Sequence, residues 1–133
     1  MKNYAELLKE WDKEYYKTTK TNKTLFELLC LRDDLIREEY FEVEDALTDY
    51  IHHANTHTML THEEDMRIGL LKELCDLVYV CIGTATSLGM DFDTAFRLVH
   101  ANNMLKFDKP SFNEAGKTLK KNNHPKPNLA DCI

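Results

Sequence analysis

Apolar side chains recur every three or four residues through most of the chain, which is the spacing of one face of an α-helix. The longest such pattern runs over about residues 24–50, without a glycine or a proline. Similar patterns predict helices over residues 4–17, about 62–88 and about 94–107. The sequence therefore predicts an all-α fold, a helical bundle of about four helices with one long helix pair at its centre.

Capping residues at the ends of these patterns favour the same boundaries. Asn22 or Thr24 can cap the second helix, because a side-chain oxygen there can accept from a free backbone N–H. Thr61 and Glu64 have the spacing of a capping box for the third helix, and Gly89 suits its end. For the fourth helix, the predicted cap is Asp91 or Asp93.

Two stretches lack a helical pattern. Residues 51–62 predict a histidine-rich polar loop, or in part a frayed extension of the second helix. His53 and His57 have a metal-ligand spacing, but no cysteine or glutamate motif accompanies them, which favours the polar loop. Residues 108–133 contain all three prolines and predict an extended tail. We expect a single domain over residues 1–133, with a helical core over about 4–107.

Composition narrows the class of protein. The chain has 133 residues, 43% of them hydrophobic and 30% charged, which is typical of a globular protein. Its formal charge of −6 argues against general nucleic-acid binding, and no apolar run reaches membrane-spanning length. We therefore expect a cytoplasmic protein without a membrane or nucleic-acid partner. Its four cysteines form no CxxC pair and are expected to be reduced, and in the helices to lie in the core.

Acidic side chains interrupt the apolar face of the second helix. Glu39 and Glu42 fall where the repeat calls for apolar residues, between Leu35 and Val43. A carboxylate removed from water costs on the order of several kcal/mol unless a partner compensates its charge. Two carboxylates one turn apart also repel each other, so the pattern indicates a bound cation.

The third helix repeats this feature. Glu73 falls on its apolar face, and Asp76 lies one turn further on. Antiparallel packing of the two helices could bring the four carboxylates together, and oxygen ligands alone favour Mg²⁺ or Mn²⁺ over zinc. Mg²⁺ in such sites usually also binds substrate phosphates. A solvated face with salt bridges is the competing interpretation for each pair taken alone. A di-iron bundle is disfavoured, because no glutamate has a histidine three residues later.

The predicted fourth helix offers groups for phosphate oxygens. Asn103 and Lys106 are spaced i, i+3 near its end. An amide and an ammonium could bind phosphate oxygens, although the same residue types are also ordinary at helix ends.

Three segments together resemble the MazG-like, all-α nucleoside triphosphate pyrophosphohydrolases. Residues 37–42 (REEYFE) resemble the EExxE element of that family, and residues 73–76 (ELCD) with the apolar LVY that follows resemble its ExxD element. Residues 99–106 (VHANNMLK) are similar to its third element, in which an Asn-Met pair precedes a lysine. The elements occur in the family's order over about residues 28–106.

The resemblance implies Mg²⁺-dependent hydrolysis of a nucleoside or deoxynucleoside triphosphate to the monophosphate and pyrophosphate, with Mn²⁺ as a possible substitute. It implies a homo-dimer or homo-tetramer whose active sites border a subunit interface. Glu38 and Glu39 are the expected catalytic acids, with Glu38 orienting water. The expected metal ligands are Glu39, Glu42, Glu73 and Asp76, and the expected substrate contacts are Lys72, Asn103 and Lys106.

Two positions depart from the third element. Asn102 stands where a small hydroxyl residue is common, and Leu105 replaces a small polar one. The alternative function is a non-catalytic, helical, oligomeric protein that binds nucleotides or another protein.

Overall fold

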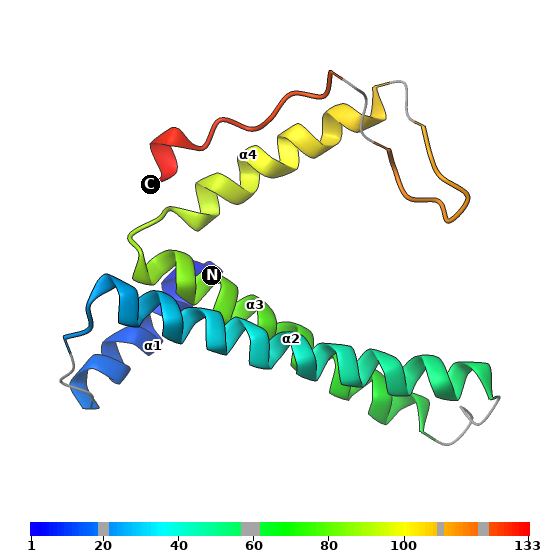
Figure 1. The fold of residues 1–133 in the computed structure, drawn as a ribbon, viewed down its shortest axis with the longest axis horizontal. Helices are drawn as coiled ribbons and strands as arrows, with labels where there is room; N and C mark the ends of the chain where they lie inside the picture. The colour runs from blue at the N-terminus through cyan, green and yellow to red at the C-terminus, as the bar shows by residue number, and fades with distance from the viewer. Residues whose placement is uncertain (19–21, 57–61, 109–110, 120–122) are drawn as a thin grey trace. The chain divides into compact units, whose positions relative to one another are not determined.

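The computed structural model describes residues 1–18, 22–56, 62–108, 111–119 and 123–133, and their side chains except those of 16–18. Four α-helices make up most of it: α1 (Tyr4–Thr18), α2 (Leu25–Asn55), α3 (Glu63–Ser87) and α4 (Phe92–Met104) (Figure 1). Two 3₁₀ turns follow, η2 (Leu105–Phe107) and η3 (Ala130–Cys132). Within these residues the only β-type pairing is an isolated antiparallel bridge between Phe112 and Thr118. The prediction of an all-α fold is confirmed.

The chain forms two compact units, residues Met1–Thr84 and Ala85–Ile133. In the first unit, α2 and α3 run side by side (Figure 1). Tyr50 of α2 donates a hydrogen bond to Glu63 at the start of α3, over 3.3 Å, while Arg32 near the other end of α2 lies against Gly83 of α3. Residue numbers rise along one helix as they fall along the other, so the pair is antiparallel, as the sequence predicted.

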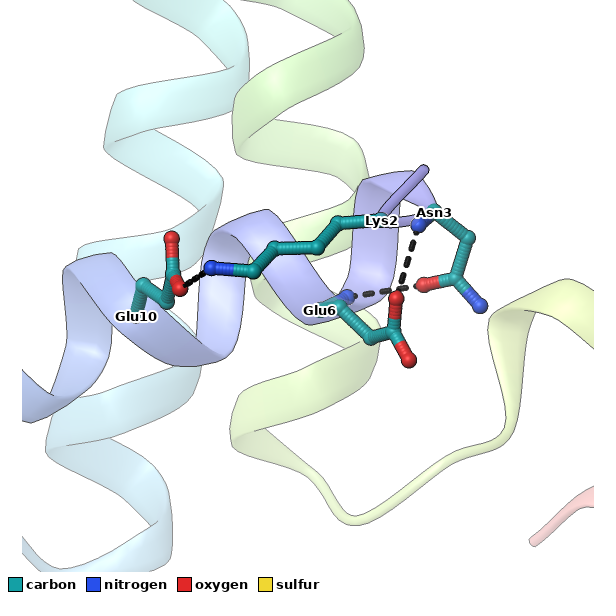
Figure 2. Close-up of polar contacts among 4 residues, drawn as sticks. All are labelled: Lys2, Asn3, Glu6 and Glu10. Atoms are coloured by element: carbon teal, nitrogen blue, oxygen red, sulfur yellow. Dashed lines mark hydrogen bonds and ion pairs between the residues drawn. The ribbon is translucent and has the colours of Figure 1, made fainter.

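Side-chain caps fix the helix starts. Thr24 and Glu27 form a capping box at α2, where the Glu27 carboxylate accepts from the Thr24 N–H at 2.8 Å. Asn3 and Glu6 make the same reciprocal pair at α1, each N–H donating over 2.9 Å, and Lys2 pairs with Glu10 one turn beyond (Figure 2). Because each box satisfies two otherwise free N–H groups, both helices begin where the apolar patterns begin.

The far end of α2 follows the second of the two expectations for residues 51–62, an extension of the helix. Residues 51–55 continue the helix to Asn55. The Thr56 hydroxyl donates to the His52 carbonyl oxygen at 3.0 Å, and His53 Nδ1 lies 2.8 Å from the Asp49 carbonyl oxygen. These local bonds support helical backbone where hydrophobic periodicity is absent. The expected cap residue Thr61 and the ligand candidate His57 lie outside the described residues.

Helix α1 packs across the α2–α3 pair at a point where α3 has no side chain. A Cβ atom at Gly83 would lie 3.1 Å from Leu8 Cδ2 and 3.2 Å from Arg32 Nη1. Gly83 therefore allows the three helices to approach closely. Burial raises the pKa of nearby Asp12, and the Arg32 guanidinium opposes that rise. Trp11 stacks on Tyr15 with 5.0 Å between ring centroids and meets Tyr79 of α3 edge-on at 6.3 Å, so these aromatic rings join α1 to α3.

Few side chains are fully buried. Leu8, Val43 and Ile82 are the buried hydrophobic residues in the described part of the first unit. The four cysteines are free, but Cys30 and Cys75 are exposed, so the prediction that the helical cysteines lie in the core is wrong for these two. Large apolar side chains on both long helices are exposed instead, among them Phe26, Phe41, Ile51, Ile68 and Leu71.

In the second unit the tail returns along α4. The Asn102 amide donates to the Pro125 carbonyl oxygen, and His124 Nε2 lies 2.9 Å from its amide oxygen. At the start of α4, the Asp91 N–H donates to the Cys132 carbonyl oxygen at 2.8 Å, and Cys132 is buried. Asp91 is also the cap of α4, accepting from the Thr94 N–H. Asn102, a departure from the family pattern, thus attaches the tail to the helix.

None of the helices in the described part of the chain combines the length and the apolar composition that a membrane crossing requires.

Candidate metal centre

Carboxylates from both long helices meet midway along the α2–α3 pair. Glu39 and Glu42 lie one turn apart on α2, and Glu73 faces them from α3. One oxygen from each lies within 4.8 Å of the other two. The antiparallel packing therefore brings together three of the four predicted ligands, as the matched sequence patterns indicated.

Glu39 is half-buried. Its Oε2 atom is buried and has no hydrogen-bond partner among the described residues. Burial raises the pKa of Glu39, and the negative charges of Asp76, Glu38 and Glu73 raise it further, against a smaller lowering by Lys72. The charge of this carboxylate is thus compensated only in part, by Lys72.

The Glu73 carboxyl group, facing Glu42 across the helix interface, is the largest cause of a raised Glu42 pKa. Two ionised carboxylates with oxygens within 4.8 Å of each other repel, because neither can donate a hydrogen bond to the other. Glu42 is exposed, so water moderates this repulsion more than it does for Glu39.

Asp76, the fourth predicted ligand, lies beside the cluster and binds a lysine. The Lys72 ammonium is 2.9 Å from Asp76 Oδ2 and 3.1 Å from Glu73 Oε2, both on its own helix. It is 3.9 Å from Glu42 Oε2 on α2. These acids raise the pKa of Lys72, so its side chain stays fully charged. Sequence analysis assigned Lys72 to the substrate and missed this contact with the ligands, although its i, i+4 spacing to Asp76 was a signal.

The residues present fit a magnesium ion. Mg²⁺ binds oxygen ligands at about 2.0–2.1 Å, which places neighbouring ligand oxygens about 3–4 Å apart. The three oxygens, within 4.8 Å of one another, need only a small contraction to reach that spacing. The unpartnered Glu39 oxygen supplies the electrostatic reason to bind a cation. Oxygen donors without thiolate or imidazole match Mg²⁺ or Mn²⁺.

The other predicted site residues lie outside the group of three carboxylates. Glu38 is exposed at the edge of the cluster and acts on Glu39 through its charge. Asn103 and Lys106 belong to the second unit, where the Lys106 ammonium donates to the Asn103 amide oxygen at 2.7 Å. This pair holds an amide and an ammonium together, which is the combination expected for binding phosphate oxygens.

The fold and the cluster define an all-α protein with a carboxylate site between antiparallel helices. The family model described as phosphoribosyl-ATP pyrophosphohydrolase matches residues 1–103, which are most of the chain and include all four predicted metal ligands. The chain belongs to this family. A search of the curated proteins gave no match. Membership confirms the broad group of pyrophosphohydrolases acting on nucleotide-like substrates, while the closer assignment to the MazG-like members stays a prediction.

Proposed function

We propose that this protein hydrolyses a nucleoside or deoxynucleoside triphosphate to the monophosphate and pyrophosphate, with Mg²⁺ as its metal and Mn²⁺ as a possible substitute. The observation that carries the proposal is the buried, unpartnered Glu39 oxygen within a three-carboxylate cluster formed by two helices. A carboxylate held this way destabilises the metal-free protein, which a purely structural role does not explain.

Each side chain has a distinct part in the proposed reaction. Glu39, Glu42, Glu73 and Asp76 would hold the metal, which supplies charge neutralisation and a more acidic bound water. Glu38, exposed beside Glu39, orients the attacking water from the solvent side. Pyrophosphate then leaves as the water adds to phosphorus. Lys72, beside the acids, would contact substrate phosphates, and Asn103 and Lys106 keep the phosphate-binding role that the sequence predicts for them.

Phosphoribosyl-ATP is a second candidate substrate, because the family description names it. It carries the same triphosphate chain as ATP, so the same carboxylates and bound water would serve for either substrate. The two substrates differ around the base, so the protein would distinguish them by its contacts to base and sugar. A difference of about 1.36 kcal/mol in transition-state binding changes the rate about tenfold, so even modest contacts would give measurable differences in rate between substrates.

A substrate panel tests the proposed function. Canonical and modified NTPs, dNTPs and phosphoribosyl-ATP are incubated with the protein and Mg²⁺, and pyrophosphate is measured. We expect release from at least one of them, and its complete loss with EDTA. If no member yields pyrophosphate, the alternative of a non-catalytic nucleotide-binding or interaction protein replaces this proposal. Phosphate release without pyrophosphate would contradict the proposed bond cleavage.

A homo-dimer or homo-tetramer is part of the proposal. Its support is the exposed apolar surface of the long helices, where Ile68 is 59% and Leu71 63% exposed. Monomeric soluble proteins rarely leave large contiguous apolar patches in water. Light scattering of the eluting protein should give two or four times the 15.6 kDa chain mass. We expect Leu71→Glu to lower that mass, whereas a monomeric wild-type protein would contradict this part.

A further inference from the structure

The Lys72 ammonium lies among the carboxylates that are expected to bind a metal ion, so it competes with the metal for them. Its ammonium contacts three of the four predicted ligands: Asp76 at 2.9 Å, Glu73 at 3.1 Å and Glu42 at 3.9 Å. These contacts span both helices of the cluster. An ammonium has three N–H donors and no acceptor, so it binds to lone pairs of the same carboxylate groups that a metal would need.

The ammonium compensates the cluster incompletely. Lys72 forms no ion pair with Glu39 within 4.0 Å in the described structure, and the buried Glu39 oxygen keeps no partner. A divalent ion between Glu39, Glu42 and Glu73 would bring twice the charge to the acid that the lysine does not reach. The lysine is therefore the weaker of two possible counterions.

The lysine side chain is free to withdraw. It is 61% exposed, so its departure opens no cavity in the core. Four rotatable bonds allow its ammonium to move into solvent or toward a bound phosphate while its backbone stays in α3. A metal bound to these carboxylates would repel the ammonium, because both are cations.

We propose that Lys72 is an intramolecular counterion that occupies the acid cluster in the metal-free protein and is displaced when a divalent cation binds. This inference rests on the proposed metal site. After displacement, the ammonium is available to bind the substrate triphosphate. Lys72 would then have both roles in turn: counterion of the acids without metal, and substrate contact, as the sequence predicts, with metal.

The test uses Mn²⁺ alone, without nucleotide, titrated into the full-length protein at low salt and followed by electron paramagnetic resonance of the free ion. Removing the competing cation in Lys72→Met should tighten Mn²⁺ binding about three- to tenfold, the scale expected for a largely exposed charge. Lys72→Arg keeps a competing cation and should stay within about twofold of wild type. Lys13→Met is the matched control, because it removes an exposed α1 lysine and the same net charge.

A second measurement is the midpoint of thermal unfolding. In EDTA, Lys72→Met should unfold at a lower temperature than Lys13→Met, because the acids lose their internal counterion. Saturating Mn²⁺ should abolish that difference. Increasing salt should reduce the affinity gain of Lys72→Met, since the competition is electrostatic.

The outcomes separate this inference from the proposed function. If Glu39→Gln abolishes Mn²⁺ binding but Lys72→Met binds no more tightly than Lys13→Met, the metal site stands and the displacement is wrong. Weaker binding by Lys72→Met would also overturn it, because the lysine would then assist the metal by holding the acids in place. If wild type binds no Mn²⁺, the metal site and the displacement fail together.

Discussion

The acid pairs of α2 and α3 have the same spacing in the sequence but different surroundings in the structure. On α3, Glu73 and Asp76 both contact the ammonium of Lys72 within 3.1 Å. On α2, Glu39 has a buried oxygen without a partner in the described structure, and Glu42 reaches the same ammonium only at 3.9 Å. The α3 pair has a counterion on its own helix, whereas on α2 the buried Glu39 oxygen has no hydrogen-bond partner in the described structure.

This difference shows that a spacing pattern locates acids but does not give their charge balance. The charge balance of the acids depends on Lys72, the residue before the α3 pair, and on the burial of the Glu39 carboxylate. If the proposed metal binds, Glu39 is therefore the acid that gains most from it. Changes on α2 should act mainly on metal binding and activity, whereas changes on α3 should also disturb the internal ion pair.

The largest expected effect is the loss of activity in Glu39→Gln. The amide keeps the size of the side chain but removes the charge that binds the metal. We expect pyrophosphate release with Mg²⁺ to fall at least about 100-fold, since even groups that only support metal ligands cost 10–100-fold when replaced. The control is Glu44→Gln, an exposed acid of the same helix outside the cluster. Full activity in Glu39→Gln would contradict the site.

Stability without metal should separate the two pairs. In EDTA, Glu39→Gln removes a buried and only partly compensated charge and should raise the free energy of unfolding by about 1 kcal/mol. Asp76→Asn removes an ion-pair partner of Lys72 and should lower it by a few tenths of a kcal/mol, because that pair is largely exposed. Urea denaturation of both variants measures this. The contrast between the helices is wrong if the two changes shift stability in the same direction.

The pH dependence of stability follows from the raised Glu39 pKa. An acid with a higher pKa in the folded state binds its proton more tightly when folded, so stability falls as the pH rises above the ordinary value of 4.5 toward the raised one. In EDTA, wild type should therefore lose more stability than Glu39→Gln between about pH 4 and pH 8. Urea midpoints across that range measure the difference. Parallel profiles would show that Glu39 ionises in the folded protein as freely as in the unfolded one.

The sequence predicted the helices well because short-range rules decide them. Thr24 caps α2 as expected, Asp91 caps α4, and Gly89 has the positive φ of 75° that suits a residue after a helix end. It also predicted that Glu39, Glu42 and Glu73 would meet, since antiparallel helices with matched stripes leave few other arrangements.

Other features depend on contacts between distant residues, and no spacing rule reveals them. The sequence pattern shows Gly83 only as one position in the third helix, yet in the structure it lies against Leu8 and Arg32 from two other helices. Asn102 looked like a departure in a phosphate-binding element, and it holds Pro125, 23 residues away. Cys30 and Cys75 have apolar sequence neighbours but are exposed. The spacing of apolar residues along one helix does not say which of them another helix will cover.

The smallest expected effect is the change in stability caused by Gly69→Ala. This variant tests whether a more stable helix pair, without any change of charge, alters activity. Gly69 lies inside α3 one turn before Lys72, and a Cβ there meets no atom of the described structure within 4 Å. Alanine should therefore raise the free energy of unfolding by about 0.5–1 kcal/mol through helix propensity alone. Gly83→Ala should gain less in the same urea denaturation, because its Cβ would lie 3.1 Å from Leu8.

Activity should stay unchanged in Gly69→Ala, because the substitution adds no charge and removes no ligand. A variant that is stabilised and active, beside a Glu39→Gln variant that is stabilised and inactive, would show that the loss in the latter comes from the missing carboxylate and not from a stiffer helix pair. If Gly69→Ala lost activity to the same degree, motion of α3 would have to be part of catalysis, and the contrast between the two acid pairs would no longer suffice to explain the site.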